Sequence, residues 1–480
     1  MSPRLCLSVV VGIAALSGCA VGPDYKRPAF DAAAAYKEQS GWKPSEPGDA
    51  LSRGPWWTIF NDPVLDDLEA KINISNENVK AALASYDQAR ALVDQAQAGF
   101  WPTVAANLSR LRGSGRGGAS TVTANNVTTV IPTGASTSTT YSAGASANWS
   151  LDIWGQIRRT VESDRASAQA SAAALAAAQL SAQATLATDY FELRAQDQLQ
   201  RLLDDTVMAE QLSLKITESR YRYGVAAKAD VVSAEAQLLS SQAQQINAKI
   251  QRATLEHAVA VLIGQQPAQF SLSTTTMRSD VPTVPPGVPS TLLERRPDVA
   301  EAERKVAAAN AQIGVATAAY FPSLTLSGSD QYTSSMWSHL ISLPNRTWSV
   351  GPSLAETLFD GGLRRAQVAQ ARAAWESNVA SYRQTVLSGF EQVEDQIATL
   401  RILEQQAVVE EEAVKAAREA EALTLNQYKA GTVPYSSVIT AQTTRLSAEE
   451  TALSVLSSRL QASVALIEAL GGGWSSSALR

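Results

Sequence analysis

Few residues of this chain have the types and spacing that catalysis requires. Its 480 residues include two histidines, His257 and His339, and neither has a carboxylate or a cysteine at ligand spacing. This argues against a metal site or an activated nucleophile. Residues 113–118 match a dinucleotide-binding glycine pattern, but they follow a polar, strand-like stretch and open no helix, so the required context is missing. No GxSxG, HExxH or Walker sequence occurs. The sequence therefore predicts a protein that is not an enzyme and that needs no cofactor or metal.

Cys19 is the residue for which the sequence predicts covalent chemistry. Arg4 precedes an apolar run over residues 5–16, which is too short to span a bilayer, and Leu16-Ser17-Gly18-Cys19 follows. This order is typical of a bacterial lipoprotein signal, in which the cysteine becomes the acylated first residue of the mature chain. We therefore expect residues 1–18 to be a signal peptide and Cys19 to carry lipid such as palmitate. Ala20 resembles the pattern of lipoproteins sorted to the outer membrane. The alternative is a signal peptide that merely contains a cysteine.

Composition narrows the remaining classes of function. The second cysteine, Cys6, lies in the segment to be removed, so the mature chain would have neither a free thiol nor a disulfide. The net charge of −6 provides no basic surface for nucleic acid. No apolar run of about 18 residues or more follows the signal, so any crossing of a membrane must be made by strands.

An aromatic–proline sequence separates a helix-like run from a strand-like run twice in the chain. Phe100-Trp101-Pro102 does so in the first half and Tyr320-Phe321-Pro322 in the second. Proline ends the helix at both places, because it lacks a donor and pushes the preceding residue into extended geometry. We interpret the chain as an internal duplication with repeats at 63–291 and 292–480, preceded by an extended surface tether at 19–62. A Gly/Ser/Thr/Asn-rich loop over residues 113–140 lengthens the first repeat.

Each repeat contains two stretches with the two-residue period of a strand. In the clearest stretch, residues 141–153, apolar Trp149, Leu151 and Ile153 alternate with small polar residues. The other stretches are residues about 102–112, 322–331 and 347–359. Their lengths suit tilted strands that cross a bilayer, and aromatic residues cluster at one end as in an interfacial girdle. The alternative, edge strands of a soluble sandwich, fits poorly because the strands lead into helices that are far too long for a sandwich.

Four such strands cannot close a barrel, and open edges are not tolerated in lipid. The smallest bacterial barrels have about eight strands. Two chains would supply eight strands and three would supply twelve. The sequence therefore predicts an oligomer and leaves its order open.

Very long helices follow the strands. Helical hairpins are predicted at about 156–265 and 362–470, and the first helix alone would extend about 100 Å. Leu446, Leu453 and Leu460 form a heptad seam. Gly224 and Gly431 lie where each helix turns back, at the end of the hairpin far from the strands. One interpretation is a simple helix-ending glycine; the other is that these tips meet a partner and open or close.

These features together resemble the TolC-type outer-membrane factor family of bacterial tripartite exporters, in its NodT-type lipoprotein branch. The matching segments cover nearly the whole mature chain. They are Cys19-Ala-Val-Gly-Pro-Asp-Tyr25, Trp57–Leu65, Leu293-Glu-Arg-Arg-Pro-Asp298, Ala311-Gln-Ile-Gly-Val315, Phe321-Pro-Ser-Leu-Thr325 and Ala469-Leu-Gly-Gly-Gly-Trp474.

The resemblance implies a mainly α-helical fold with a membrane β-barrel: a homotrimer with a twelve-stranded barrel, a periplasmic tunnel of helices and an equatorial region. It implies a passive conduit in the outer membrane that receives substrates from an inner-membrane pump through a periplasmic adaptor. It also places adaptor docking at the two hairpin tips. The residues concerned are Gly224, Val225, Ala226, Gly431, Thr432 and Val433.

One departure from the family concerns the periplasmic gate. Close relatives often carry leucine, aspartate and arginine after the second tip, where this chain has Ser436, Thr440 and Thr443. We therefore expect a looser or differently built gate that relies on Asp230 and Glu235 of the first tip. The competing function is a structural or adaptor envelope lipoprotein without channel activity. The sequence does not reveal which substrates, pump or adaptor are involved.

Overall fold

The structure is a computed structural model. It describes residues 20–30, 36–39, 54–115, 119–124, 127–132, 136–284 and 295–474. The predicted signal peptide and Cys19 lie outside these residues. The chain forms two compact units. The first contains Met1–Arg27, Ala89–Ala168 and Lys305–Asn378, and the second contains Pro28–Gln88, Gln169–Arg304 and Val379–Arg480.

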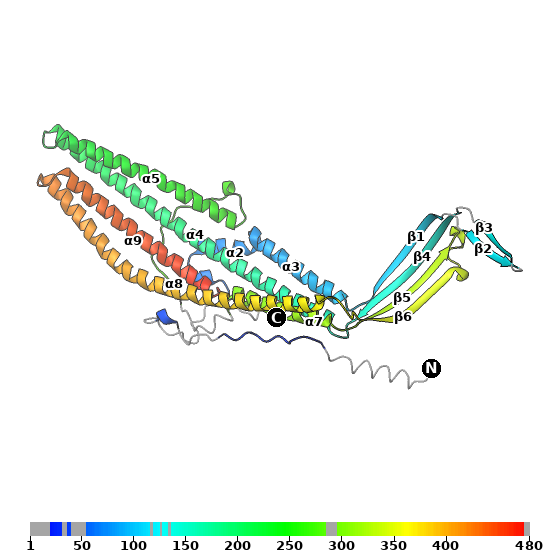
Figure 1. The fold of residues 1–480 in the computed structure, drawn as a ribbon. Coiled ribbons are helices and arrows are strands. Elements are labelled where there is room, and N and C mark those ends of the chain that lie inside the picture. Colours follow the sequence, from blue (N-terminus) through cyan, green and yellow to red (C-terminus); the bar gives the residue numbers. More distant parts are fainter. Residues whose placement is uncertain are drawn as a thin grey trace. The chain divides into compact units, whose positions relative to one another are not determined.

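The first unit contains an antiparallel four-stranded sheet in the order β1-β4-β5-β6 (Figure 1). Its strands are β1 (Thr103–Gly115), β4 (Ser136–Leu151), β5 (Ser323–Ser334) and β6 (Arg346–Ala355). The ladder between β5 and β6 starts at the pair Ser323 and Ala355, because Pro322 has no N–H to donate. The predicted fold class, mainly helical with four such strands in each chain, is confirmed.

The glycine- and threonine-rich loop of the first repeat was predicted to lack strands, and this prediction is wrong in part. β2 (Ala119–Ala124) and β3 (Val127–Pro132) pair as a separate antiparallel hairpin. β1 and β4 also extend beyond their predicted ends, to the pair Gly115 and Ser136. Threonine and valine are β-branched and suit extended backbone, which explains why this polar stretch forms strands.

Apolar side chains of the sheet remain exposed in the single chain. Val104, Leu108, Val350 and Leu354 are each at least 66% exposed. The outer strands β1 and β6 each have one neighbour, so neither edge of the sheet has a further partner strand among the described residues. Apolar strands with open edges require a covering environment or further strands.

Seven α-helices lie in the described residues, and their lengths repeat between the two halves of the chain. They are α2 (Pro63–Ser75), α3 (Glu77–Ala98), α4 (Gln156–Arg222), α5 (Lys228–Leu262), α7 (Pro297–Ala318), α8 (Leu363–Ala430) and α9 (Tyr435–Ala469). α4 and α8 have 67 and 68 residues, and α5 and α9 have 35 each. No helix in the described ranges is both long and apolar enough to cross a membrane.

Glycines end both returning helices at tight contacts. Gly264 after α5 and Gly471 after α9 have φ angles of 68° and 92°, the left-handed conformation that favours glycine at helix ends. A Cβ atom would lie 2.2 Å from the Ser75 carbonyl oxygen at the first position and 2.1 Å from the Arg295 carbonyl oxygen at the second.

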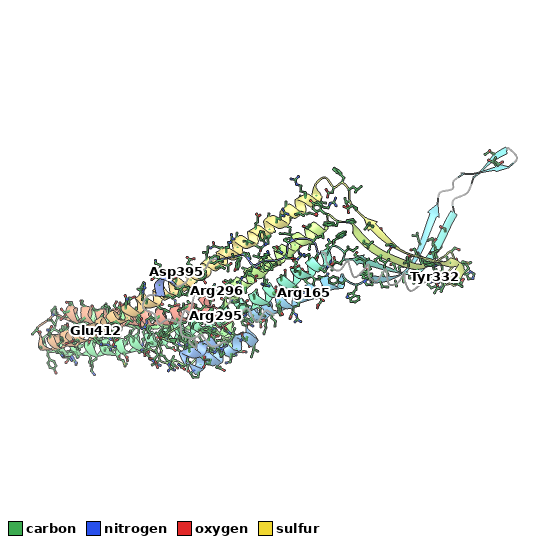
Figure 2. All side chains as sticks on the ribbon, turned by 90° about the horizontal axis from the view of Figure 1, so that it is seen from below. Arg165, Arg295, Arg296, Tyr332, Asp395 and Glu412 are labelled. Carbon is green, nitrogen blue, oxygen red and sulfur yellow. The ribbon has the colours of Figure 1, made fainter. Side chains whose placement is uncertain are left out.

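The Arg-Arg-Pro-Asp motif joins the start of α7 to other helices of the second unit. Figure 2 labels its two arginines, Arg295 and Arg296. Arg296 Nη1 donates to Gln392 Oε1 at 2.9 Å and to the Ala469 carbonyl oxygen at 3.0 Å. Its Nη2 also pairs with Asp298 Oδ2 at 2.6 Å. One arginine therefore joins the start of α7, the middle of α8 and the end of α9.

The hydrophobic core of the second unit contains part of the segment predicted as a surface tether. Trp56–Phe60 forms a short 3₁₀ helix, η2. Trp56 is 2% exposed and its Nε1 donates to Gln183 Oε1 at 3.3 Å. The prediction of an extended surface segment is wrong here, because two tryptophans and a phenylalanine gain more from burial than from exposure to water.

Candidate functional site

Each predicted docking tip is a short turn closed by glycine. Gly224 and Gly431 have φ angles of 72° and 80°. Beside them, Val225 N donates to the Arg220 carbonyl oxygen at 2.8 Å and Thr432 N to that of Gln427 at 3.0 Å. Gly224, Val225, Gly431 and Thr432 are exposed, whereas Ala226 and Val433 are half-buried. The turns therefore expose backbone and small side chains.

Arg220 joins the two tips within one chain. Its Nη1 donates to the carbonyl oxygens of Tyr428 and Lys429 at 2.8 and 2.7 Å. The guanidinium also lies 4.7 Å from the centroid of the Tyr428 ring. These contacts connect the last turns of α4 and α8, whose unpaired carbonyls favour a cation. Sequence reasoning missed this contact, which joins residues about two hundred positions apart.

An aromatic cluster supports the same connection. Tyr428 and Tyr435 lie edge to face with ring centroids 5.1 Å apart, and both are buried together with Ala234 and Val438. Burial, with Glu210 nearby, raises the pKa of Tyr435 to about 12. Tyr435 is therefore neutral at physiological pH and serves as packing for the tips.

The five gate candidates lie on two helices of the second unit. Asp230 Oδ2 accepts from Ala227 N at 3.3 Å and so caps α5, while Glu235 on the same helix is exposed. Ser436, Thr440 and Thr443 are all exposed at helical spacing on α9. The two threonine hydroxyls donate to the carbonyl oxygens of Ser436 and Ile439 at 3.1 and 3.0 Å. These hydroxyls therefore already have partners on their own helix. Since serine and threonine are neutral, the α9 stripe presents an uncharged surface.

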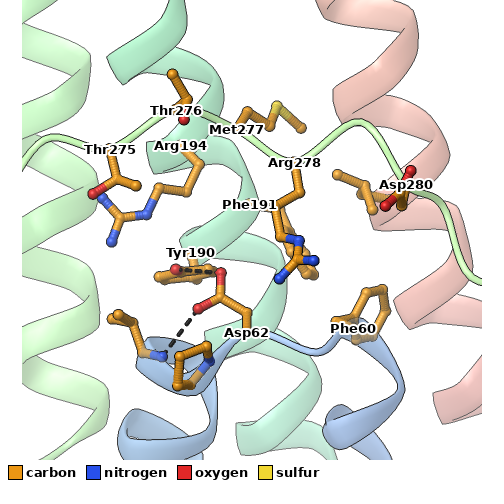
Figure 3. Close-up of a pocket in the computed structure, with 13 residues that line it drawn as sticks. Phe60, Asp62, Tyr190, Phe191, Arg194, Thr275, Thr276, Met277, Arg278 and Asp280 are labelled. Carbon is orange, nitrogen blue, oxygen red and sulfur yellow. Dashed lines mark hydrogen bonds between the residues drawn. The ribbon is translucent and has the colours of Figure 1, made fainter.

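A pocket of about 320 Å³ lies elsewhere in the second unit, beside the start of α2 (Figure 3). Asp62 Oδ1 accepts from Val64 N at 3.0 Å, and Asp62 Oδ2 accepts from the Tyr190 hydroxyl at 2.7 Å. Burial and this hydrogen bond raise the pKa of Tyr190. Arg194 lies 4.8 Å from the centroid of the Tyr190 ring. The hydrogen bond between Tyr190 and Asp62 holds the start of α2 against α4, and sequence reasoning missed this contact.

Among the described residues, no three His, Cys, Asp or Glu side chains lie close enough to hold a metal ion.

Comparison with known proteins identifies the family. The protein-family model described as outer membrane efflux protein matches residues 70–265 and 288–472. The probable efflux pump outer membrane protein TtgC of Pseudomonas putida is 30% identical over 98% of this chain and 95% of that protein. Nodulation protein T of Rhizobium leguminosarum bv. trifolii is 28% identical over 89% of this chain and 88% of that protein.

Solved structures agree with these relatives. The outer-membrane channel OprN superposes with a TM-score of 0.84 at 31% identity, over 95% of this chain and all of that chain. The resemblance drawn from the sequence is confirmed, and such relatives are efflux channels rather than enzymes. The family model matches both halves of the chain, and TtgC is 30% identical over nearly all of it. The chain therefore belongs to the outer membrane efflux protein family.

Proposed function

We propose that this chain is the outer-membrane channel-tunnel of a tripartite efflux system. Three copies would close a twelve-stranded barrel and continue it as a periplasmic tunnel of helices. The observation that carries this proposal is the sheet, which among the described residues has two unpaired edges and exposed apolar side chains. Its strand β4 leads within a few residues into the 67-residue helix α4. Copies of the same sheet are the simplest partners that satisfy such edges in lipid.

The channel would act as a passive conduit, with an inner-membrane pump that supplies energy and a periplasmic adaptor that docks on the tips. Relatives are named for toluene efflux, cation efflux and pyoverdine export. Such varied cargo on similar channels supports selection of the substrate by the pump. No observation favours the alternative of a structural or adaptor envelope lipoprotein. The proposal includes a lipid anchor at Cys19 and requires neither cofactor nor catalysis.

Native mass spectrometry of the protein extracted from membranes in mild detergent tests this assembly. We expect a complex of three chains, each beginning at Cys19 and carrying acyl chains. Cys19→Ser is the matched control, which should lose the acyl mass. A monomer that is released from cells without detergent would contradict both the barrel and the function.

We also propose that the Gly224–Ala226 and Gly431–Val433 turns form the adaptor-docking tips, and that the gate lacks an ionic lock on α9. Asp230 and Glu235 remain its charged candidates, beside the uncharged stripe of Ser436, Thr440 and Thr443. Because this stripe is uncharged, other contacts must keep the gate closed. We infer that the contact of Arg220 with α8 is one of them.

Arg220→Met tests this view of the gate. The change keeps a long apolar stem and removes two charge-assisted hydrogen bonds, each worth about 1.5–3 kcal/mol. We expect a higher resting conductance in planar bilayers and a larger uptake of bulky hydrophilic antibiotics by cells. Arg222→Met is the matched control, since Arg222 is exposed on the last turn of the same helix. Equal resting conductance of the Arg220→Met and wild-type channels would rule out this contact as part of the gate.

A further inference from the structure

Two of the family-matching segments contact each other in the first unit, and neither has a role so far. They are the segment after Cys19, which contains Val21-Gly-Pro-Asp-Tyr25, and the Ala311–Val315 segment of α7. Asn310 Nδ2, on the residue just before the second segment, donates to the Pro23 carbonyl oxygen at 2.9 Å. A Cβ atom on Gly22 would lie 2.4 Å from Gly314 Cα, so the two backbones touch. Only glycine permits such an approach, and the φ angle of 101° at Gly22 also requires it.

Arg159 of α4 also holds this segment, and its side chain lies against Gly314. The residue is 5% exposed. Its Nε donates to the Val21 carbonyl oxygen at 3.2 Å, and its Nη2 donates to the Gly22 carbonyl oxygen at 3.3 Å and pairs with Asp24 Oδ1 at 2.9 Å. The Asp24 side chain is 90% exposed, so this ion pair contributes little. The two backbone carbonyls and the burial of the guanidinium fork carry the interaction.

The first described residues of the segment lie at the junction of strand and helix. Val21 N donates to the Trp154 carbonyl oxygen at 3.1 Å. A Cβ atom on Gly155 would lie 2.8 Å from Ala20 Cα. Trp154 and Gly155 belong to the short link between the end of β4 and the start of α4. Ala20 and Val21 therefore lie next to the link that follows the end of β4.

Aromatic groups mark this junction as the interfacial end of the strands. The Trp154 ring stacks on Phe321 at a centroid distance of 4.8 Å, and Trp154 Nε1 donates to the Pro322 carbonyl oxygen at 2.8 Å. Trp149 Nε1 likewise donates to the Phe100 carbonyl oxygen at 2.9 Å. Indole rings with one apolar face and one satisfied N–H are typical of a membrane–water boundary.

We propose that Ala20–Asp24 is a docking motif, and that the site formed by Gly155, Arg159, Asn310 and Gly314 binds it so as to fix the lipid anchor at the interfacial end of the strands. This inference rests on the proposed lipidation of Cys19. One residue spans at most about 3.6 Å, so the backbone that bears the acyl chains lies one peptide from the docked Ala20. The anchor is then a fixed part of the strand–helix junction instead of the end of a loose tether.

A fixed anchor has a consequence for assembly. Acyl chains in the inner face of the bilayer hold the strand ends at the membrane surface, which raises the local concentration of strands where they must insert and pair. Undocking would leave the lipid attached but separate it from the strands by a flexible segment. Arg159 and Gly314 are thus positioning residues for the anchor.

The test uses Arg159→Met and Gly314→Val in the full-length protein, with Arg165→Met as the matched control. Arg165 is exposed on the same helix (Figure 2). Trypsin cleavage after the exposed Lys26 reports undocking, and mass spectrometry of the released peptide 19–26 reports acylation. Circular dichroism checks the helix content. The fraction of heat-sensitive oligomer on unboiled gels reports assembly.

We expect cleavage after Lys26 to be about tenfold faster in both variants, with unchanged acyl mass. We expect the oligomer fraction to fall by about threefold or more. Repeating Arg159→Met in a Cys19→Ser background separates anchor positioning from plain packing, because without lipid the variant should cause no further loss of oligomer.

Three results would overturn the proposal. Unchanged cleavage after Lys26 would show that the segment is not held by these residues. An equal loss of oligomer with and without lipid would make Arg159 a structural residue alone. A wild-type peptide without acyl chains would refute the lipidation and the anchor role with it, while the cleavage rates would still decide whether the motif docks.

Discussion

Asp197→Ala is expected to destabilise the chain by about 3–5 kcal/mol, because it leaves buried arginine without its carboxylate partner. Asp197 is 1% exposed, in the middle of α4. Its Oδ2 accepts from Arg194 Nη1 at 2.9 Å and its Oδ1 from Arg252 Nε at 2.7 Å. The Arg194 side chain is itself only 4% exposed, so water cannot replace the lost carboxylate.

The same carboxylate also holds an extended segment against the helices. Thr275 N donates to Asp197 Oδ2 at 3.2 Å. The two arginines donate to neighbouring carbonyl oxygens, Arg194 to Ser273 at 2.7 Å and Arg252 to Leu272 at 2.6 Å. Loss of Asp197 therefore frees the segment that forms one wall of the pocket in Figure 3. We expect this wall to become accessible to proteases at temperatures at which the long helices remain folded.

The thermal midpoint measured by circular dichroism on the detergent-solubilised protein checks this prediction. The internal repeat provides a control, because Glu404 on α8 is the position 207 residues later and is exposed. Glu404→Ala should leave the midpoint nearly unchanged. The pair Arg194→Met and Asp197→Leu should be less destabilising than Asp197→Ala, since it removes Asp197 together with the more buried of its two arginine partners, while Arg252 keeps its ion pair with Glu256. If Asp197→Ala and Glu404→Ala behave alike, the buried network has no role in stability.

Local periodicity predicted most of the architecture from the sequence. The alternation in residues 141–153 predicted a strand, and the absence of proline in 156–222 allowed a long helix. Both signals come from residues that are close together in the sequence. The structure has β4 and α4 there. Polar clusters were not predictable in this way. Arg220 and Tyr428 are about two hundred residues apart, and their contact exists only because the two hairpins turn at corresponding glycines. The charge of Arg220 was visible, but its partners were backbone carbonyls, which carry no signal in the sequence.

Burial of residues in irregular segments was the other limit. Trp56 lies in a Pro- and Gly-rich stretch with no helical or strand period, and such a stretch favours an interpretation as surface chain. Its place in the core follows from ring size and from contact with Gln183, which is more than a hundred residues away. The β2–β3 hairpin was missed for a similar reason, since its polar composition resembles that of a loop.

Glu69→Gln is expected to stabilise the chain at neutral pH, by about 3 kcal/mol at pH 7. Glu69 lies on α2 between the buried residues Leu65, Leu68 and Ile72 and is itself 0% exposed. Neither of its carboxylate oxygens has a hydrogen-bond partner in the described part of the chain. Burial, followed by the nearby charge of Asp66, raises the pKa of Glu69 to about 9.

The direction of the pH effect follows from the two protonation states. Below the ordinary glutamate pKa of 4.5, the side chain is neutral in both the folded and the unfolded chain, and Glu69 costs nothing through ionisation. Between this value and about 9, the unfolded chain ionises while the folded chain keeps the proton. Each pH unit in this window therefore removes about 1.4 kcal/mol of stability.

Thermal midpoints of the wild type and of Glu69→Gln at pH 4.5, 7 and 8.5 measure this effect. The two proteins should have similar midpoints at pH 4.5 and should diverge as the pH rises, with the variant more stable. Glu77→Gln is the matched control, since Glu77 is exposed on α3 and should not alter the pH dependence. A constant difference between wild type and Glu69→Gln across the three pH values would mean that the variant acts through packing.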